Sequence, residues 1–115
     1  EIRGAEALDM LQALNTGHDG SMSTGHSNSA GDMLDRIEAM ALMAGYGTAE
    51  GIRRQIGSGI HLIIHLKKDG NGSRKIQEIV KVLGCRNNRI EYKTVIAERG
   101  LIVDDEIFKS LTDYA

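Results

Sequence analysis

Glu1-Ile2-Arg3-Gly4 opens the chain, and Gly17-His18-Asp19-Gly20-Ser21-Met22-Ser23-Thr24-Gly25-His26-Ser27-Asn28-Ser29 follows one helix-like stretch later. An acidic residue at the end of a strand, followed by a turn rich in Gly, His, Ser and Thr, is an arrangement that places polar chemistry on a scaffold. No apolar run precedes Glu1 to form that strand. We therefore expect the chain to be a piece of a larger α/β enzyme that begins inside a motif.

Three helices are predicted in the first half of the chain. The first covers residues 4–15, with Leu8, Leu11 and Leu14 on one face, and ends at Asn15-Thr16-Gly17. Ser29 and Asp32 are spaced as a capping pair for the second helix, and Thr48 is placed to cap the third. The apolar positions of these two helices have helical spacing: Met33, Leu34, Ile37, Met40, Ala41 and Ala44, then Ile52 and Ile56.

A small β-meander is predicted in the second half. Residues 60–66 alternate as a strand, with Ile60, Leu62, Ile64 and Leu66 on one face and His61, Ile63 and His65 on the other. Turns at 69–72 and 84–88 separate further strands at 75–83 and 90–97. We also expect a short buried strand at 21–24. Residues 1–97 form the main unit, and residues 98–115 form a tail in which a short helix could start at Asp104.

Composition limits the function classes. The formal net charge is −2, with one Phe, three Tyr and no Trp, so neither bulk charge nor aromatic stacking favours a nucleic-acid partner. No apolar run reaches the roughly 20 residues of a membrane span. The single Cys85 excludes an internal disulfide and fits a reducing cytoplasm.

Polar residues between Gly17 and Ser29 are the strongest candidates for a site. Two histidines and five Ser or Thr hydroxyls within thirteen residues are suited to a polyphosphate. The alternative is a polar loop between two helices. A zinc site at His18 and His26 lacks a visible third ligand, so we expect no metal bound directly by this chain. A Ser/His hydrolase lacks a Gly-x-Ser-x-Gly elbow.

The charged candidates each have two interpretations. Glu1 could polarise a water or hold a metal-bound water, or it could be a solvated terminal side chain. Arg3 could bridge to phosphate or form a surface ion pair. Arg53 and Arg54 could be a solvated surface pair or a phosphate clamp that reaches across a subunit boundary, and the sequence favours the solvated pair. No Gly-x-x-x-x-Gly-Lys-Ser/Thr loop occurs in the chain, so the usual device for gripping a nucleotide is not within it.

These segments together resemble the type II/IV secretion superfamily of hexameric ATPases, most closely its Flp/Tad pilus-assembly branch. Residues 1–7 are similar to the family's Gly-Glu-x-Arg-Gly segment at the end of the Walker B strand, and residues 15–29 to its histidine box. The looser similarity continues through residues 32–40, 52–66 and 72–79. Ala30-Gly31 stands where relatives often have Pro, and the pattern is lost after about Arg86.

The resemblance implies a fold and roles. The chain would be the C-terminal part of a RecA-like P-loop ATPase core. Glu1 would be the Walker B carboxylate, and His26, with His18, would sense the γ-phosphate. The nucleotide-binding positions would be Arg3, Gly17, Ser23 and Thr24. ATP and Mg²⁺ would be the cofactors of the intact protein, whereas the isolated chain, without a phosphate loop, is expected to bind neither and to be inactive.

The resemblance also implies partners. The intact protein would form a hexamer at the cytoplasmic side of the inner membrane, with secretion or pilus platform proteins. The alternative is a non-enzymatic regulatory or assembly module that keeps the fold. For the chain alone we expect self-association, because the strand at 21–24 and the helix faces around Leu11 and Ile37 would lack part of their cover.

Overall fold

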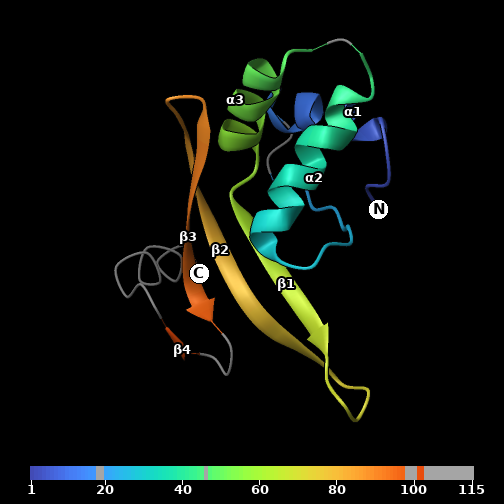
Figure 1. Cartoon of the computed structure of the whole chain (residues 1–115), viewed down its shortest axis with the longest axis vertical. Helices are drawn as coiled ribbons and strands as arrows, with labels where there is room; N and C mark the ends of the chain where they lie inside the picture. Colours follow the sequence, from blue (N-terminus) through green and yellow to red (C-terminus); the bar gives the residue numbers. More distant parts are fainter. Residues whose placement is uncertain (18–19, 46, 98–100, 103–115) are drawn as a thin grey trace.

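Three helices precede a four-stranded sheet in the computed structural model, which describes residues 1–17, 20–45, 47–97 and, in backbone only, 101–102. The helices are α1 (Glu6–Leu14), α2 (Ala30–Leu42) and α3 (Ala49–Gly59). The strands are β1 (Leu62–Lys68), β2 (Arg74–Arg86), β3 (Arg89–Ala97) and β4 (Leu101–Ile102). Figure 1 shows the helices grouped on one side of the sheet, while the β1–β2 hairpin extends beyond them.

The helix starts are fixed by side chains. Ser29 Oγ accepts a hydrogen bond from Asp32 N at 3.0 Å, and Thr48 Oγ1 accepts one from Gly51 N at 3.0 Å, which confirms both predicted caps. In α1 the N-cap, Ala5, has no side-chain acceptor. Glu6 Oε1 instead accepts from the backbone N–H groups just before the helix, those of Arg3 at 2.6 Å and Gly4 at 3.0 Å.

The sheet is an antiparallel meander in the order β1-β2-β3-β4, as the turn signals predicted for its first three strands. The β1–β2 turn is closed by Asp69, whose N–H donates to Ser73 O at 2.8 Å. The β2–β3 turn is Asn87-Asn88, with φ of 53° and 60°. Asparagine tolerates this left-handed conformation better than other non-glycine residues, and two such residues make the tight hairpin turn.

One predicted strand and one predicted turn boundary are wrong. Residues 21–24 do not form a strand: Met22 is 95% exposed, and the backbone bond that binds the segment to residue 2 joins Ile2 N to Thr24 O at 2.7 Å. A strand needs a ladder of such bonds. The turn predicted at 84–88 begins only at Asn87, because Gly84 and Cys85 continue β2, opposite Glu91 and Ile90.

The end of the sheet also differs from the prediction. The short strand β4 was not predicted, and it pairs with the end of β3 through Ile96↔Ile102 and Ala97↔Leu101. The helix predicted from Asp104 lies outside the described residues.

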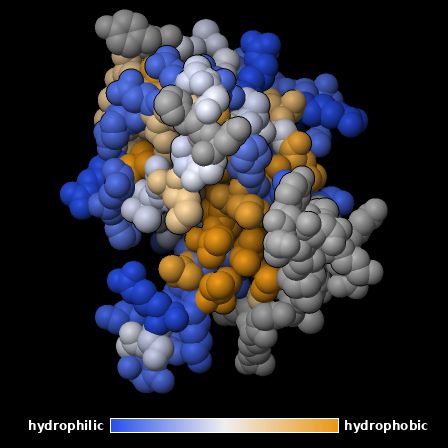
Figure 2. Space-filling model, turned by 180° about the vertical axis from the view of Figure 1, so that it is seen from behind, coloured by the Kyte–Doolittle hydropathy of each residue, from blue (hydrophilic) through white to orange (hydrophobic). Residues whose placement is uncertain are grey.

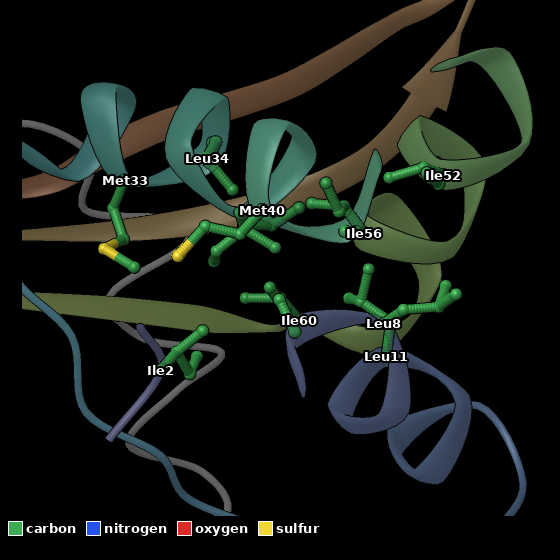
Figure 3. Packing of buried hydrophobic residues seen from close by; sticks show 13 residues of the cluster. Ile2, Leu8, Leu11, Met33, Leu34, Met40, Ile52, Ile56 and Ile60 are labelled. Atoms are coloured by element: carbon green, nitrogen blue, oxygen red, sulfur yellow. The ribbon is translucent and has the colours of Figure 1, made fainter. Parts of the chain in front are cut away.

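The hydrophobic core lies where the three helices meet the sheet. The predicted helix faces supply most of it, and Leu11, Ala41 and Ile56 are 0% exposed. Figure 3 shows the side chains of the three helices converging, with Ile2 and Ile60 closing the cluster. The buried members are Ile2, Ala7, Leu8, Leu11, Met33, Leu34, Ile37, Met40, Ala41, Ile52, Ile56, Ile60 and Val82. The helix faces expected to lack cover are therefore buried.

α3 lies directly on β2 at a glycine. A Cβ added to Gly57 would lie 2.6 Å from Cys85 N and 2.7 Å from the Gly84 carbonyl carbon. These distances are shorter than any side chain could accept, and the neighbouring atoms belong to the backbone. Gly57 thus sets how closely the helix approaches the sheet.

One face of β1 is left open. Ile63 and His65 are half-buried on the helix side, whereas Leu62, Ile64 and Leu66 are 41%, 54% and 50% exposed on the other. Ile76, which pairs with Leu66, is 47% exposed. Figure 2 shows an apolar patch on the side of the molecule opposite to the view of Figure 1. We call Leu62, Ile64, Leu66 and Ile76 the open sheet face.

Candidate functional site

Ile2 anchors the candidate site. Its side chain is 8% exposed within the core, and its N–H donates to Thr24 O at 2.7 Å. In an extended segment neighbouring side chains point to opposite sides, so burying Ile2 turns Glu1 and Arg3 outward. The same hydrogen bond brings the segment that carries His26 beside Glu1.

Glu1, Arg3 and His26 form one charged cluster. Arg3 Nε donates to Glu1 Oε2 at 2.5 Å, and a second Arg3 nitrogen contacts the same oxygen. His26 Nε2 contacts the other oxygen, Glu1 Oε1. The Glu1 side chain is 22% exposed, while those of Arg3 and His26 are 80% and 85% exposed. The carboxylate is therefore held between two nitrogen groups that remain accessible to solvent.

The cluster keeps Glu1 ionised. The hydrogen bond from Arg3 is the main cause that lowers the pKa of the Glu1 carboxyl below its ordinary value. Partial desolvation opposes this, and the charges of Arg3 and His26 lower the pKa further. At neutral pH Glu1 is thus an acceptor that can orient a water molecule, and Arg3 and His26 can donate to an anionic oxygen.

The other predicted site residues are placed as follows. Thr24 lies beside the cluster through its bond to Ile2, and its neighbour Ser23 is exposed in the same segment. Gly17 adopts a φ of 89° after α1, which fits its predicted part in ending the helix. His18 lies outside the described residues.

Two contacts between distant elements were not predicted. Arg53 Nε donates to Glu38 Oε1 at 2.5 Å and its Nη2 to Glu38 Oε2 at 3.3 Å, so α3 is tied to α2. Arg54 is exposed, as expected for a solvated side chain, whereas Arg53 is half-buried and engaged with Glu38. His65 Nδ1 lies 3.8 Å from Glu78 Oε1, and that carboxylate also accepts from Ala30 N at 2.7 Å. The partners are 13 to 48 residues apart, and no local pattern links them.

The described residues hold neither a metal-binding cluster nor a membrane-spanning helix. No group of three or more His, Cys, Asp or Glu side chains among them is arranged to hold a metal ion. No helix in residues 1–17, 20–45 or 47–97 is long and apolar enough to cross a membrane.

Sequence comparison identifies the class. Residues 1–106 match the family of type II/IV secretion system proteins, and the chain belongs to that family. It is 37% identical over 105 residues to a Mycobacterium tuberculosis protein named for conjugal transfer, which covers 90% of this chain. It is 35% identical over 91 residues, 79% of the chain, to the conjugal transfer protein TrbB of Rhizobium radiobacter. The type IV secretion system protein PtlH of Bordetella pertussis is 35% identical over 82 residues, 65% of the chain.

The chain spans less than a third of these relatives. The matched regions cover 29%, 27% and 23% of the three proteins, in the same order. The family expectation is thus confirmed, together with a link to secretion systems. The three relatives carry conjugal-transfer and type IV secretion names, so the pilus-assembly branch stays a prediction.

Proposed function

We propose that this chain is part of an ATPase that powers secretion, and that the Glu1, Arg3 and His26 cluster is part of its catalytic centre. The observation that carries the proposal is the convergence of an ionised carboxylate with two solvent-accessible nitrogen groups. Family membership supports the link to secretion systems. The RecA-like character of the complete core and the pilus-assembly role belong to the same proposal.

Glu1 would act on the attacking water. In phosphoryl transfer there is little covalent chemistry for the protein, and catalysis is mainly positioning and charge stabilisation. The ionised Glu1 carboxylate would accept a hydrogen bond from the water and align it. His26 and Arg3 are each 80% exposed or more, so either could turn to donate to a γ-phosphate oxygen.

The donor chemistry fits Mg-ATP. A carboxylate suits Mg²⁺ or its bound waters, and cationic nitrogens suit phosphate. Mg²⁺, bound with the nucleotide, would neutralise charge that develops on the phosphate oxygens. The remaining phosphate contacts would come from a phosphate loop elsewhere in a longer protein, because the 115 residues contain no such motif.

The assembly proposed with this function is a homo-oligomeric ring. Secretion ATPases of this kind would work at the inner membrane against platform proteins, on the cytoplasmic side. This part of the proposal rests on family resemblance, and size-exclusion chromatography with membrane flotation of the longer protein would test it. A monomer that does not float with membranes would contradict it.

Glu1→Gln in the longer protein tests the catalytic role. Gln keeps the size of the side chain and removes the charge that orients water, so turnover should fall at least ~100-fold while ATP binding survives. Glu91→Gln is the matched control, since Glu91 is an exposed carboxylate on β3. Phosphate release and calorimetric ATP binding are the measurements. Near-normal turnover in Glu1→Gln would refute the catalytic role of Glu1. Absence of phosphate release in the unsubstituted longer protein would instead favour the non-enzymatic module.

The isolated chain gives a second test. Without a phosphate loop it should not bind Mg-ATP measurably, because most nucleotide contacts are missing. A calorimetric titration that yields a Kd below about 100 μM, or roughly 5.5 kcal/mol, would show that the chain holds more of the nucleotide site than proposed.

A further inference from the structure

The start of α2 rests on the sheet. Glu78, on β2, accepts a hydrogen bond from the N–H of Ala30, the first residue of α2, at 2.7 Å. The next residue, Gly31, lies against Tyr92 of β3, where an added Cβ would be 2.6 Å from the phenol oxygen. Two strands thus hold one helix end in place.

This contact suits the charges at a helix end. The first N–H groups of a helix have no partner within it, and the helix dipole places partial positive charge there. Ser29 Oγ satisfies the N–H of Asp32, and the Glu78 carboxylate satisfies that of Ala30. Glu78 is 23% exposed, so water competes weakly for its oxygen.

The segment before α2 is otherwise lightly held. His26 lies between two anchors, Thr24 O on Ile2 N upstream and the α2 start downstream. Ser27 Oγ donates to Ser29 O at 2.7 Å, and Gly25 lies against Met33, where a Cβ would meet Met33 Cε at 2.6 Å. Through these contacts the position of the α2 start determines the position of residues 25–29.

We infer that Glu78 is a positioning residue: by holding the first turn of α2 on the sheet, it fixes the segment Gly25–Ser29 so that His26 meets Glu1. The inference has two parts. The effect of Glu78 on turnover rests on the proposed function, whereas its effect on the position of His26 does not. Glu78 is 52 residues from His26 in the sequence, and its effect passes through backbone rather than through a ligand.

Three variants separate the hydrogen bond from the charge. Glu78→Ala removes the acceptor. Glu78→Gln keeps an acceptor oxygen and should rescue the position of the segment. Ala30→Pro removes the donor, and proline is well tolerated at the first position of a helix. Glu91→Ala is the control for the loss of a carboxylate from the same sheet.

The first measurement uses the 115-residue chain. In Glu78→Ala, the rate of amide hydrogen exchange at Ala30 should rise at least about tenfold, because losing a hydrogen bond to a charged acceptor changes the opening equilibrium by about that factor. The nuclear Overhauser contact between the Met33 methyl and Gly25 should weaken in both Glu78→Ala and Ala30→Pro, and persist in Glu78→Gln and Glu91→Ala. An unchanged contact in Glu78→Ala, with the fold intact by circular dichroism, would overturn the inference.

The second measurement uses the longer protein. Glu78→Ala should lower kcat about tenfold with little change in KM for ATP, Glu78→Gln should restore most of it, and adding Ala30→Pro to Glu78→Ala should cause little further loss. A normal kcat in Glu78→Ala, where His26→Ala is impaired, would overturn the catalytic part. If His26→Ala is also normal, the proposed function fails, and the exchange and contact data still decide the geometric part.

Discussion

Glu6 holds the start of α1 and, with it, the backbone on which Arg3 sits. Its carboxylate accepts hydrogen bonds from Arg3 N and Gly4 N. The bond from Arg3 N is the main cause that lowers the pKa of Glu6 below its ordinary value. A carboxyl group whose pKa is lower in the folded state stabilises the fold above its unfolded pKa, and this contribution is lost as the pH falls through the folded pKa.

The pH dependence of stability should therefore change in Glu6→Gln. At pH 7 the variant should unfold at a lower urea concentration than the original chain, and the difference should shrink as the pH falls below about 4.3, the usual value for glutamate. Urea midpoints at pH 7 and pH 3 are the measurement, with Asp9→Asn on the same helix as the control. An equal difference at both pH values would show that the charge of Glu6 does not stabilise the start of α1.

The histidines should differ in effect. His26→Ala in the longer protein should lower turnover, since His26 contacts Glu1. His61 lies just before β1, and its carbonyl accepts a hydrogen bond from Val82 N at 2.9 Å. Because this is a backbone contact, His61→Ala keeps it and should leave turnover close to normal. Steady-state phosphate release, measured at saturating ATP, compares the two. A larger loss in His61→Ala, with the fold intact, would place the site elsewhere.

At the scale of elements, the contact between α3 and β2 has no room for a larger residue. Gly57→Ala would press a methyl group on the backbone of Gly84 and Cys85. The helix has to lift from the sheet, so the free energy of unfolding should fall by about 1–3 kcal/mol despite the better helix propensity of alanine. Thermal unfolding followed by circular dichroism measures the loss. Gly51→Ala is the comparison, since its Cβ would meet only the Thr48 hydroxyl, at 3.1 Å.

The sequence predicted the elements whose signals are local. The caps at Ser29 and Thr48 and the apolar spacing of the helices follow from contacts within four residues, and the structure confirms them. Roles in a site were expected for Glu1, Arg3 and His26 through resemblance, but their mutual contact was not predicted, and it depends on the burial of Ile2. The contact of Glu78 with Ala30 depends on how the sheet packs against α2. Hydrophobic periodicity in the sequence does not predict such a contact between distant elements. The prediction of a strand at 21–24 was wrong because the alternation there is weak, and the segment makes one backbone hydrogen bond to Ile2 instead of a ladder.

At the scale of the whole molecule, the open sheet face gives a different reason to expect self-association. The helix faces are buried, but Leu62, Ile64, Leu66 and Ile76 are exposed together. Exposed apolar groups of this kind favour contact with another surface. Lys81 pairs with Leu62 on the same face and Lys68 continues it beyond Leu66, so like charges oppose face-to-face contact at low salt.

The chain should therefore associate, and more strongly as salt screens these lysines. Ile64→Lys should reduce the association, because it places a charge in the middle of the open sheet face. Light scattering at high micromolar protein concentration and at two salt concentrations is the measurement. His61→Lys is the control, because it adds the same charge just outside β1. A monodisperse monomer of the original chain at both salt concentrations would contradict this prediction.

The β1–β2 hairpin offers a practical handle. It extends beyond the helices (Figure 1), and every residue from Gly70 to Ser73 is exposed. Exposed loop tips with small polar residues are where proteins best accept inserted sequence. A short epitope or a fluorescent amino acid placed between Gly70 and Asn71 would leave the core and the Glu1 cluster unaltered. The longer protein could then be tracked optically while it works, with the reporter carried at the tip of a two-stranded hairpin.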